Sequence, residues 1–456
     1  MSTETWASQV GRQVSGLRNS RRFRVSAGNS AFSIAEYLAQ PAAMLLAAPF
    51  LVHHLGLQQY GIWMLANAIL GSVGILSTGF GDATVKYVST YRALNDFVGV
   101  ERTIRATLTI NTVLAVVLGA LVWIFASFAV HRVFKIEISL QAVSISALKI
   151  SAVILVLRSA ESVFVSALRA FEKFGPPAKL NMFLRAIVVV SAVVLAGMGR
   201  GVVEIMMATL FWSAVVVVLQ ADAARKVVGK FHVLPTLRYD ALREVFSFGC
   251  FSWLQALTAV GFTYADRFIV AALLGTGPVA VYVICVQAAQ PIHGLTAAGF
   301  NFLFPHLSSR HEAGEVRGPR RVFKLALITN VAVAGVLSLP FFLLARPILR
   351  IWMGNQFADQ GHLVLPILAM SYAALAINVV PHNSLLALGK VRTVAALNIA
   401  GGLVLLAIMA ILIPRSGIAG AAAGRAIYTI LLAVAYLLAV RKGFTRRIFV
   451  APQPIA

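Results

Sequence analysis

Charged residues are scarce in this chain of 456 residues. They make up 12% of it, against roughly 25% in an ordinary soluble domain, and acidic residues number only 16. Hydrophobic residues reach 59%, and the mean hydropathy is +0.84. This composition excludes an ordinary soluble domain and predicts an all-α polytopic membrane protein.

Cysteine is nearly absent, and known catalytic motifs are missing. The predicted topology places Cys250 and Cys285 near opposite membrane faces, whereas a disulfide needs Cα atoms within about 7 Å. His53-His54 lacks a third ligand for a metal site. No G-x-x-x-x-G-K-[ST] pattern occurs, so an ATPase loop is not expected. We therefore predict no cofactor, no metal and no enzymatic activity.

The basic residues that are present lie mainly between the apolar runs. The net charge is +23, from 39 Lys+Arg against 16 Asp+Glu. Bases in short loops orient membrane helices and meet anionic lipid headgroups. This placement indicates membrane lipids as partners and argues against nucleic acid.

Twelve apolar runs are long enough to cross a hydrocarbon layer of about 30 Å. The predicted spans are 31–53, 61–85, 108–130, 143–167, 181–198, 202–222, 248–274, 279–304, 324–344, 363–387, 395–413 and 417–440. Of the 39 Lys and Arg residues, 28 lie in segments on the side of the N-terminus and 6 in loops on the other side. The positive-inside rule then predicts that both termini are cytoplasmic.

The two halves of the chain share one layout, repeated at a constant offset in sequence. Phe32-Ser33 matches Phe251-Ser252, and Leu55-Gly56 matches Leu274-Gly275 at the same offset. Six spans per half predict two lobes of the same orientation, related by an axis along the membrane normal, with a central cavity between them. The predicted division is a basic cytoplasmic N-terminal segment 1–29, an N-lobe 30–222, a cytoplasmic linker 223–247, a C-lobe 248–440 and a basic cytoplasmic tail 441–456.

Both lobes have a weak point in their first span. Pro41 removes a helix hydrogen bond, and Gly261, close to the offset position in the second lobe, lowers helix stability by about 1 kcal/mol. These positions are candidates either for hinges or for static packing kinks, and the sequence does not separate the two.

Isolated charges inside predicted spans are the candidate functional residues, because each costs about 2.5–3.5 kcal/mol at mid-bilayer. Asp82 and Lys86 are four residues apart, and Arg158 and Glu161 are three apart, so each pair shares a helix face. Such pairs either neutralise one another or line a lumen, and both interpretations stay open.

Three further charges lie deeper in the second half. Asp266 and Arg267 are neighbours that point about 100° apart, so at most one faces a cavity squarely. Arg425 lies about two turns into its span. Neither arginine has an acid at helical spacing, which favours a functional role.

Together these charges predict a cationic lumen for an anionic substrate. The predicted substrate-binding residues are Lys86, Arg158, Arg267 and Arg425, and the candidates for ion coupling are Asp82, Glu161 and Asp266.

Short motifs in both halves resemble one transporter family. Leu55-Gly56-x-x-x-Tyr60-Gly61-x-Trp63, followed by Gly79-Phe80-Gly81 and Lys86-Tyr87-Val88-Ser89, is similar to the start of polysaccharide-transporter (Wzx-type) flippases. Tyr264-Ala265-Asp266-Arg267-Phe268-Ile269-Val270, followed by Leu274-Gly275, resembles the opening of their second lobe. The resemblance covers about residues 30–440. Ser77-Thr78 departs from it, since many members carry an acidic residue there.

The resemblance implies a fold and an activity. The superfamily also holds MATE-type multidrug exporters and lipid II flippases, so it implies a V-shaped pair of six-helix lobes. The implied activity is transfer of an undecaprenyl-pyrophosphate-linked glycan to the outer leaflet of a bacterial inner membrane. The implied context is synthesis of lipopolysaccharide, exopolysaccharide or capsule, with a polysaccharide polymerase or export machinery as a further partner.

Two alternatives remain. One is a cation-coupled small-molecule antiporter of the same fold. The other is a membrane glycan polymerase or ligase, against which the short outer loops argue.

Overall fold

A computed structural model describes residues 43–72, 80–229, 236–300, 303, 307 and 317–445. Pro41, Ser77-Thr78 and the basic segment 1–29 lie outside these residues. Within them all regular structure is helical. The predicted all-α fold is therefore confirmed.

The described helices overlap the ten predicted spans from 108–130 onward. Their bounds are α2 Phe97–Phe128, η1 Ala129–Val133, α3 Ile138–Ala170, α4 Gly175–Gly197, α5 Val202–Val228, α6 Tyr239–Leu274, α7 Thr276–Gly299, α9 Arg317–Leu343, α10 Ala345–Met353, α11 Asn355–Gly361, α12 Val364–Ile377, α13 Val379–Ala387 and α14 Val391–Thr445. Residues 43–72 and 80–93 are also helical, apart from the turn at Gly56, whose φ is positive. Of the helical segments described, 8 are long and apolar enough to cross a membrane, including one continuous segment of 51 residues in α14. That segment contains two helices, because Gly417 is non-helical there.

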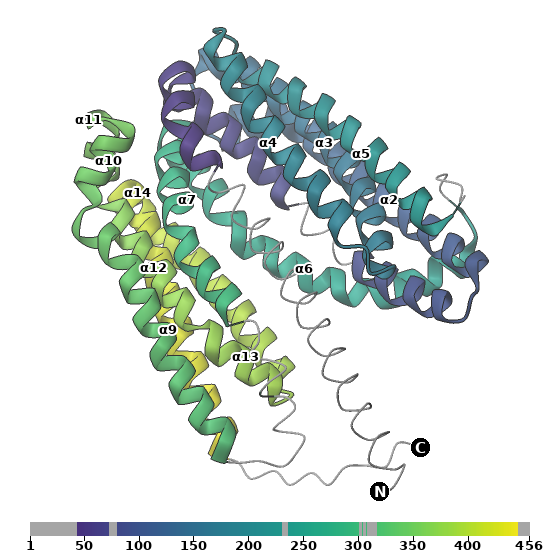
Figure 1. Ribbon diagram of the computed structural model, residues 1–456. Helices are drawn as coiled ribbons and strands as arrows, with labels where there is room; N and C mark the ends of the chain where they lie inside the picture. The colour runs from purple at the N-terminus through teal and green to yellow at the C-terminus, as the bar shows by residue number, and fades with distance from the viewer. Residues whose placement is uncertain are drawn as a thin grey trace, which may run out of the picture.

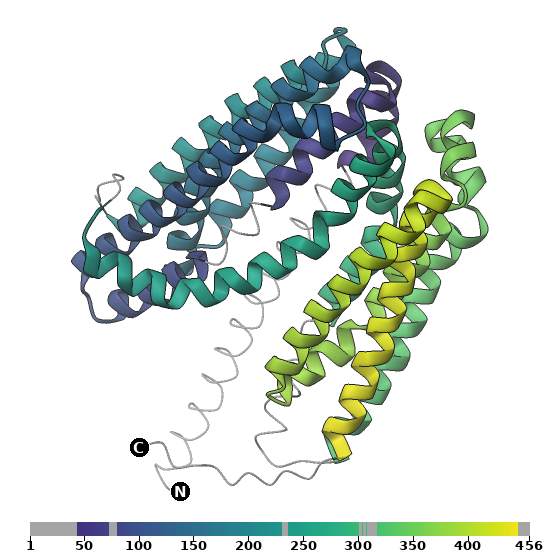
Figure 2. The same cartoon turned by 180° about the vertical axis from the view of Figure 1, so that it is seen from behind.

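The helices form two lobes that diverge like the arms of a V (Figures 1 and 2). We call 43–72, 80–93 and α2–α5 the first lobe, and α7, α9 and α12–α14 the second lobe. The lobes approach each other near α7 and separate toward the end where α9 begins and α14 finishes. We call this diverging end the basic end.

The internal repeat is visible in the backbone as left-handed residues at matched turns. Gly56 and Gly275, which are separated by the repeat offset, have φ of 76° and 92°. Gly199 and Gly417, at nearly the same separation in sequence, have φ of 73° and 58°. Glycine suits these turns, since a side chain at positive φ costs about 1–2 kcal/mol. The two lobes thus use the same turn chemistry at matched positions.

Basic residues are distributed unequally between the two ends. At the end opposite the basic end, the described turns contribute Arg132, Lys135, Arg200, Arg346, Arg350 and Arg415. The basic end carries more, among them Arg92, Arg102, Arg105, Arg169, Lys173, Lys179, Arg225, Lys226, Arg238, Arg243, Arg321, Lys324, Lys390, Arg392, Arg441 and Lys442. The numbers of Lys and Arg in the predicted loops indicate the same asymmetry. The cytoplasmic position of the basic end remains a prediction.

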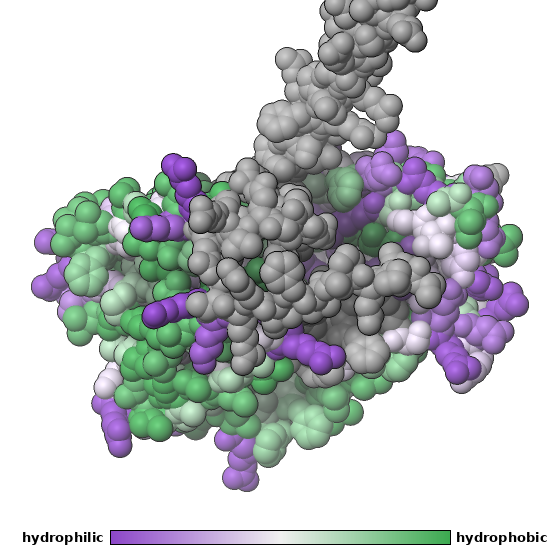
Figure 3. Space-filling view, turned by 90° about the horizontal axis from the view of Figure 1, so that it is seen from below, coloured by the Kyte–Doolittle hydropathy of each residue, from purple (hydrophilic) through white to green (hydrophobic). Residues whose placement is uncertain are grey.

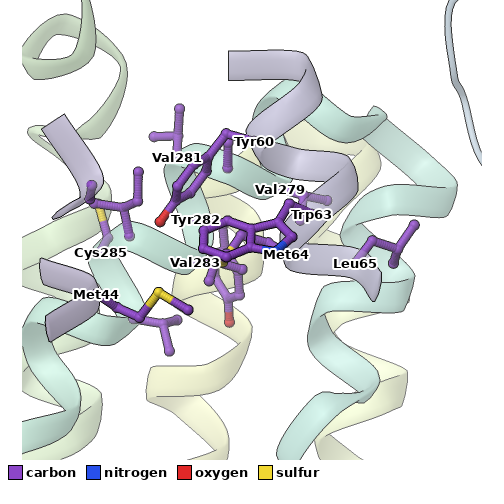
Figure 4. Close-up of a cluster of buried hydrophobic side chains, with 14 of the residues drawn as sticks. Met44, Tyr60, Trp63, Met64, Leu65, Val279, Val281, Tyr282, Val283 and Cys285 are labelled. Atoms are coloured by element: carbon purple, nitrogen blue, oxygen red, sulfur yellow. The ribbon is translucent and has the colours of Figure 1, made fainter. Parts of the chain in front are cut away.

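A dense apolar cluster holds the lobes together at the end opposite the basic end. Tyr60 and Trp63 of the first lobe pack with Val279 and Tyr282 of α7, and all four are almost fully buried (Figure 4). The backbones approach closely there, because a Cβ on Gly61 would lie 1.9 Å from the carbonyl oxygen of Thr276. This contact defines the closed end of the V.

The longest predicted outer loop, about 345–362, is largely helical. Its two short helices, α10 and α11, flank Gly354, whose φ is 91°. The indole nitrogen of Trp352 donates a hydrogen bond of 3.1 Å to the carbonyl oxygen of Leu45 in the first lobe. This segment therefore also ties the two lobes together at the closed end.

The flanks of the molecule are apolar. Large exposed hydrophobic side chains include Val113, Val117, Ile124, Phe128, Leu325, Ile328, Val336, Phe342, Leu403, Ile411, Leu431 and Leu438. Seen from the basic end, hydrophobic side chains cover much of the visible surface, and hydrophilic ones project between them (Figure 3). Such flanks fit a lipid environment.

Candidate functional site

Helix α6 connects the two lobes and carries two of the candidate charges. Near its beginning, Ala241 and Val245 pack against Phe80 of the first lobe. Nearer its end, Asp266 lies against α7 and α14 of the second lobe. Figure 2 shows α6 running from one lobe to the other.

Arg267 lies at the junction of the lobes, on this second half of α6. Its guanidinium stacks on the Tyr264 ring, 4.9 Å from the centroid. The Tyr264 hydroxyl in turn contacts the first lobe, because a Cβ on Gly71 would lie 2.3 Å from it. The Nε of Arg267 is buried without a hydrogen-bond partner among the described residues.

Tyr60 of the first lobe faces the same region. Its side chain is fully buried, its hydroxyl also lacks a partner in the described part of the chain, and it lies within electrostatic reach of Arg267. Buried polar atoms without partners are rare in native proteins and indicate an unseen water or ligand. The junction therefore holds a cation and a hydroxyl with unused hydrogen-bonding capacity.

Asp266 and Arg425 form a buried ion pair inside the second lobe. The guanidinium of Arg425 donates to Oδ2 of Asp266, and Asp266 is completely buried. The hydroxyl of Tyr282 donates to the same Oδ2 over 2.9 Å, and the backbone N–H of Arg267 donates to Oδ1 over 2.8 Å. Arg425 also donates to the hydroxyl of Tyr372 over 3.0 Å.

These four side chains meet because they lie at one depth. Asp266 precedes the turn at Gly275 by about two helical turns, and Tyr282 follows it by about the same amount. Arg425 lies about two turns after Gly417. At 1.5 Å per residue, each is about 12 Å from the closed end.

A third charged group occupies the first lobe. Glu161 of α3 is buried, with Arg158 and Arg185 within electrostatic reach. On the same helix, Ser162 accepts a hydrogen bond of 3.3 Å from the amide of Asn111. Glu161 therefore has cations from both α3 and α4, whereas the helical spacing identified only Arg158.

Asp82 and Lys86 are exposed side chains of the helical stretch 80–93. Arg169, near the end of α3, is a cation within electrostatic reach of Asp82. Neither residue belongs to the buried groups around Glu161 or Asp266. Gly261 lies within α6, which is continuously helical around it. Its hinge role stays a prediction.

The basic end of α6 is fixed to the first lobe by polar contacts. Tyr91 donates a hydrogen bond of 2.6 Å to Glu244, and Arg102 lies 3.7 Å from the same carboxylate. The hydrogen bond to Glu244 is the main reason that the pKa of Tyr91 is raised. Among the described residues, no group of three or more His, Cys, Asp and Glu side chains could hold a metal ion.

A family comparison identifies the chain. The model of a family described as "polysaccharide biosynthesis protein" matches residues 51–361. The chain belongs to this polysaccharide biosynthesis family. The predicted resemblance to polysaccharide transporters is thereby confirmed.

Relatives of this family member share its length and fold. A Shigella flexneri protein described as an O-antigen transporter is 23% identical over 411 residues, which cover 88% of this chain and 94% of that protein. Among solved structures, the lipid II flippase MurJ in an inward closed conformation has a TM-score of 0.74 at 14% identity, covering 91% of this chain and 89% of that one. An inward-facing MATE multidrug transporter has a TM-score of 0.72 at 15% identity, covering 90% and 98%. The predicted MATE-like membrane fold is therefore confirmed.

The sequence patterns missed the tyrosines of the second lobe. Tyr282 and Tyr372 carry no charge, and nothing in their local sequence distinguishes them from other aromatic residues of a membrane helix. Counting residues from the two glycine turns gives Tyr282 a depth similar to that of Asp266 and Arg425, but it does not show that they are neighbours.

Proposed function

We propose that this protein is a flippase for undecaprenyl-pyrophosphate-linked oligosaccharide repeat units. It carries them from the inner to the outer leaflet of the bacterial cytoplasmic membrane by alternating access, for surface polysaccharide synthesis. The proposal extends the family membership, the similarity to a protein described as an O-antigen transporter and the fold shared with a lipid II flippase.

The observation that carries the proposal is the position of Arg267. It lies at the junction of the lobes, with a buried Nε that has no partner among the described residues and a fully buried Tyr60 hydroxyl nearby. Arginine is well suited to a phosphate, since its planar fork donates two parallel hydrogen bonds. In this proposal Arg267 binds the pyrophosphate of the carrier lipid. The Tyr60 hydroxyl donates a further hydrogen bond to the same pyrophosphate.

The V shape suggests how the lobes would move. They are packed together at the end of Gly61 and Thr276 and diverge at the basic end. With the basic end cytoplasmic, the substrate enters from the inner leaflet between the diverging lobes. Release outward then requires separation at the closed end and approach at the basic end.

Membrane potential favours this direction of transport. Moving one negative charge outward is favoured by about 2.3 kcal/mol per 100 mV. Uncompensated movement of two negative charges would gain roughly 4–5 kcal/mol per 100 mV. Equal transport rates with and without an imposed potential would exclude this driving force.

The decisive measurement is the leaflet distribution of undecaprenyl-linked glycan in cells that lack the protein. We expect complete repeat units to accumulate in the inner leaflet, and wild-type protein to restore their transfer. Arg267→Ala should fail to restore it. Arg415→Ala is the matched control, because Arg415 is an exposed arginine of the closed-end turn, and it should restore transfer.

A normal leaflet distribution together with altered drug sensitivity would instead identify a small-molecule antiporter of the same fold. Charge reversal separates the two functions further. Arg267→Glu should abolish glycan export by a flippase, whereas it should spare or improve cation efflux by an antiporter.

A further inference from the structure

The ion pair of the second lobe has no counterpart in the first lobe. At the repeat offset, Asp266 corresponds to Ala47 and Tyr282 to Trp63, and both first-lobe residues are buried. The first lobe therefore has apolar side chains at the positions that match Asp266 and Tyr282. Because apolar replacements of a buried ion pair are often equally stable, the fold itself does not explain Asp266 and Arg425.

A second polar layer lies in the same lobe, farther from the closed end than Asp266, and we call it the deeper layer. The Tyr436 hydroxyl donates to Oδ1 of Asn398 over 2.9 Å, so the Nδ1–H of His382, 3.3 Å away, donates to the Tyr436 oxygen. His293 of α7 lies within electrostatic reach of both His382 and Arg425.

The two layers have a regular spacing. On each of three chain segments, a residue of the first layer and a residue of the second are ten or eleven positions apart. The pairs are Tyr282 and His293, Tyr372 and His382, and Arg425 and Tyr436. At 1.5 Å per residue, the separation is about 15 Å. The deeper layer lies within about two turns of the basic ends of α7, α13 and α14.

Between the layers, Asn378 is a buried amide whose bonding capacity is unused. It lies where α12 gives way to α13, it is 5% exposed, and both its Oδ1 and its Nδ2 lack partners among the described residues. Nearby on α12 and α14, the hydroxyls of Ser371 and Thr429 are 3.2 Å apart. Buried polar groups of this kind hold internal water in folded proteins.

We propose that these side chains and the waters between them form a proton path inside the second lobe, from the basic end to Asp266. A proton from water at the basic end reaches the imidazole of His382 or His293, and the imidazole passes a proton through the waters at Asn378 to the Asp266 carboxylate. The neutral carboxyl then releases the positive charge of Arg425. The path runs inside the second lobe and ends at Asp266, beside Arg267 of the lobe junction. Its purpose rests on the proposed function.

The groups that face Asp266 are consistent with this role. Asp266 accepts hydrogen bonds from the backbone N–H of Arg267 on α6, from Tyr282 on α7 and from Arg425 on α14. Arg425 in turn donates to Tyr372 on α12 and has Tyr428 within electrostatic reach. Within the described part of α9, the buried polar side chain is the uncharged Asn330. The ion pair of Arg425 therefore depends on the charge of Asp266.

The test is the charge displaced by a pH jump, recorded from reconstituted protein on a solid-supported membrane without glycan. Wild type should give a transient displacement. Asp266→Asn should abolish it, because the acceptor of the proton is gone. Asn378→Leu should slow it by about tenfold, since water in the path loses its hydrogen-bond partners. Asn111→Leu, at a buried amide of the first lobe, should change neither amplitude nor rate.

Tyr436→Phe keeps the packing volume and gives a second reading if Asn378→Leu does not fold. It should also slow the displacement. Wild-type signals from both Asp266→Asn and Tyr436→Phe would overturn the inference. Lost glycan flipping with unchanged pH responses in these variants would overturn the path alone, whereas intact pH responses without any glycan flipping by wild type would overturn the proposed function alone.

Discussion

At the scale of single residues, Arg425 shows how a charge inside a membrane protein is made tolerable. It is 9% exposed and directs its guanidinium at Asp266, which has no exposed surface. Two tyrosine hydroxyls add hydrogen bonds to the pair, from Tyr282 to Asp266 and from Arg425 to Tyr372. The pair is therefore neutral as a unit, while each member alone would be a buried charge.

Removal of one partner should consequently cost far more than removal of both. Arg425→Met leaves the Asp266 carboxylate buried without its cation, and should lower the free energy of unfolding by about 3–5 kcal/mol. Arg425→Met combined with Asp266→Leu should recover most of this loss. Thermal unfolding of the detergent-solubilised proteins measures the stability of the single and of the double variant. A double variant as unstable as the single one would contradict the interpretation.

At the scale of elements, the contact between the first-lobe helix 43–72 and α7 closes one end of the molecule. It depends on the missing side chain of Gly61, where a Cβ would lie 1.9 Å from the Thr276 carbonyl oxygen. Cys285 lies in the same apolar cluster and is fully buried. The native cysteine can therefore report whether this end is closed.

Gly61→Ala should push the two helices apart and expose Cys285. All proteins in this test carry Cys250→Ser. We expect maleimide to label Cys285 slowly when residue 61 is glycine, and markedly faster in Gly61→Ala. Gly335→Ala is the control, because a Cβ at Gly335 meets nothing within 4 Å. Equal labelling rates in all three proteins would show that this contact does not close the junction.

At the scale of the whole molecule, the repeat and the charge asymmetry predict one orientation in the membrane. Because their turns match at Gly56 and Gly275, the two lobes are expected to enter the membrane in the same direction. From the excess of Lys and Arg at the basic end, the positive-inside rule predicts that this end is cytoplasmic.

This orientation is testable by cysteine labelling of intact cells. In the Cys250→Ser background, Arg200→Cys should react with an impermeant maleimide added outside. Lys173→Cys should react only after the membrane is permeabilised, since Lys173 is an exposed residue of the basic end. The reverse pattern would contradict the predicted orientation and, with it, the direction of transport.

Several features of this protein were determined by the sequence alone, because they depend on local properties. A run of about 20 apolar residues is long enough to cross the membrane whatever surrounds it. A glycine at Leu55-Gly56 and Leu274-Gly275 supplies the left-handed turn without help from other helices. The fold class and the family were therefore predicted correctly from the chain.

The partners of the buried charges were decided only by the tertiary structure. Asp266 and Arg425 are 159 residues apart in sequence, so helical spacing along either helix reveals no acid beside Arg425. Their pairing arises because α6 and α14 reach the same depth from their glycine turns and pack together in the second lobe. The physical reason is that a buried ion needs a counter-charge in three dimensions, and packing, not sequence distance, supplies it.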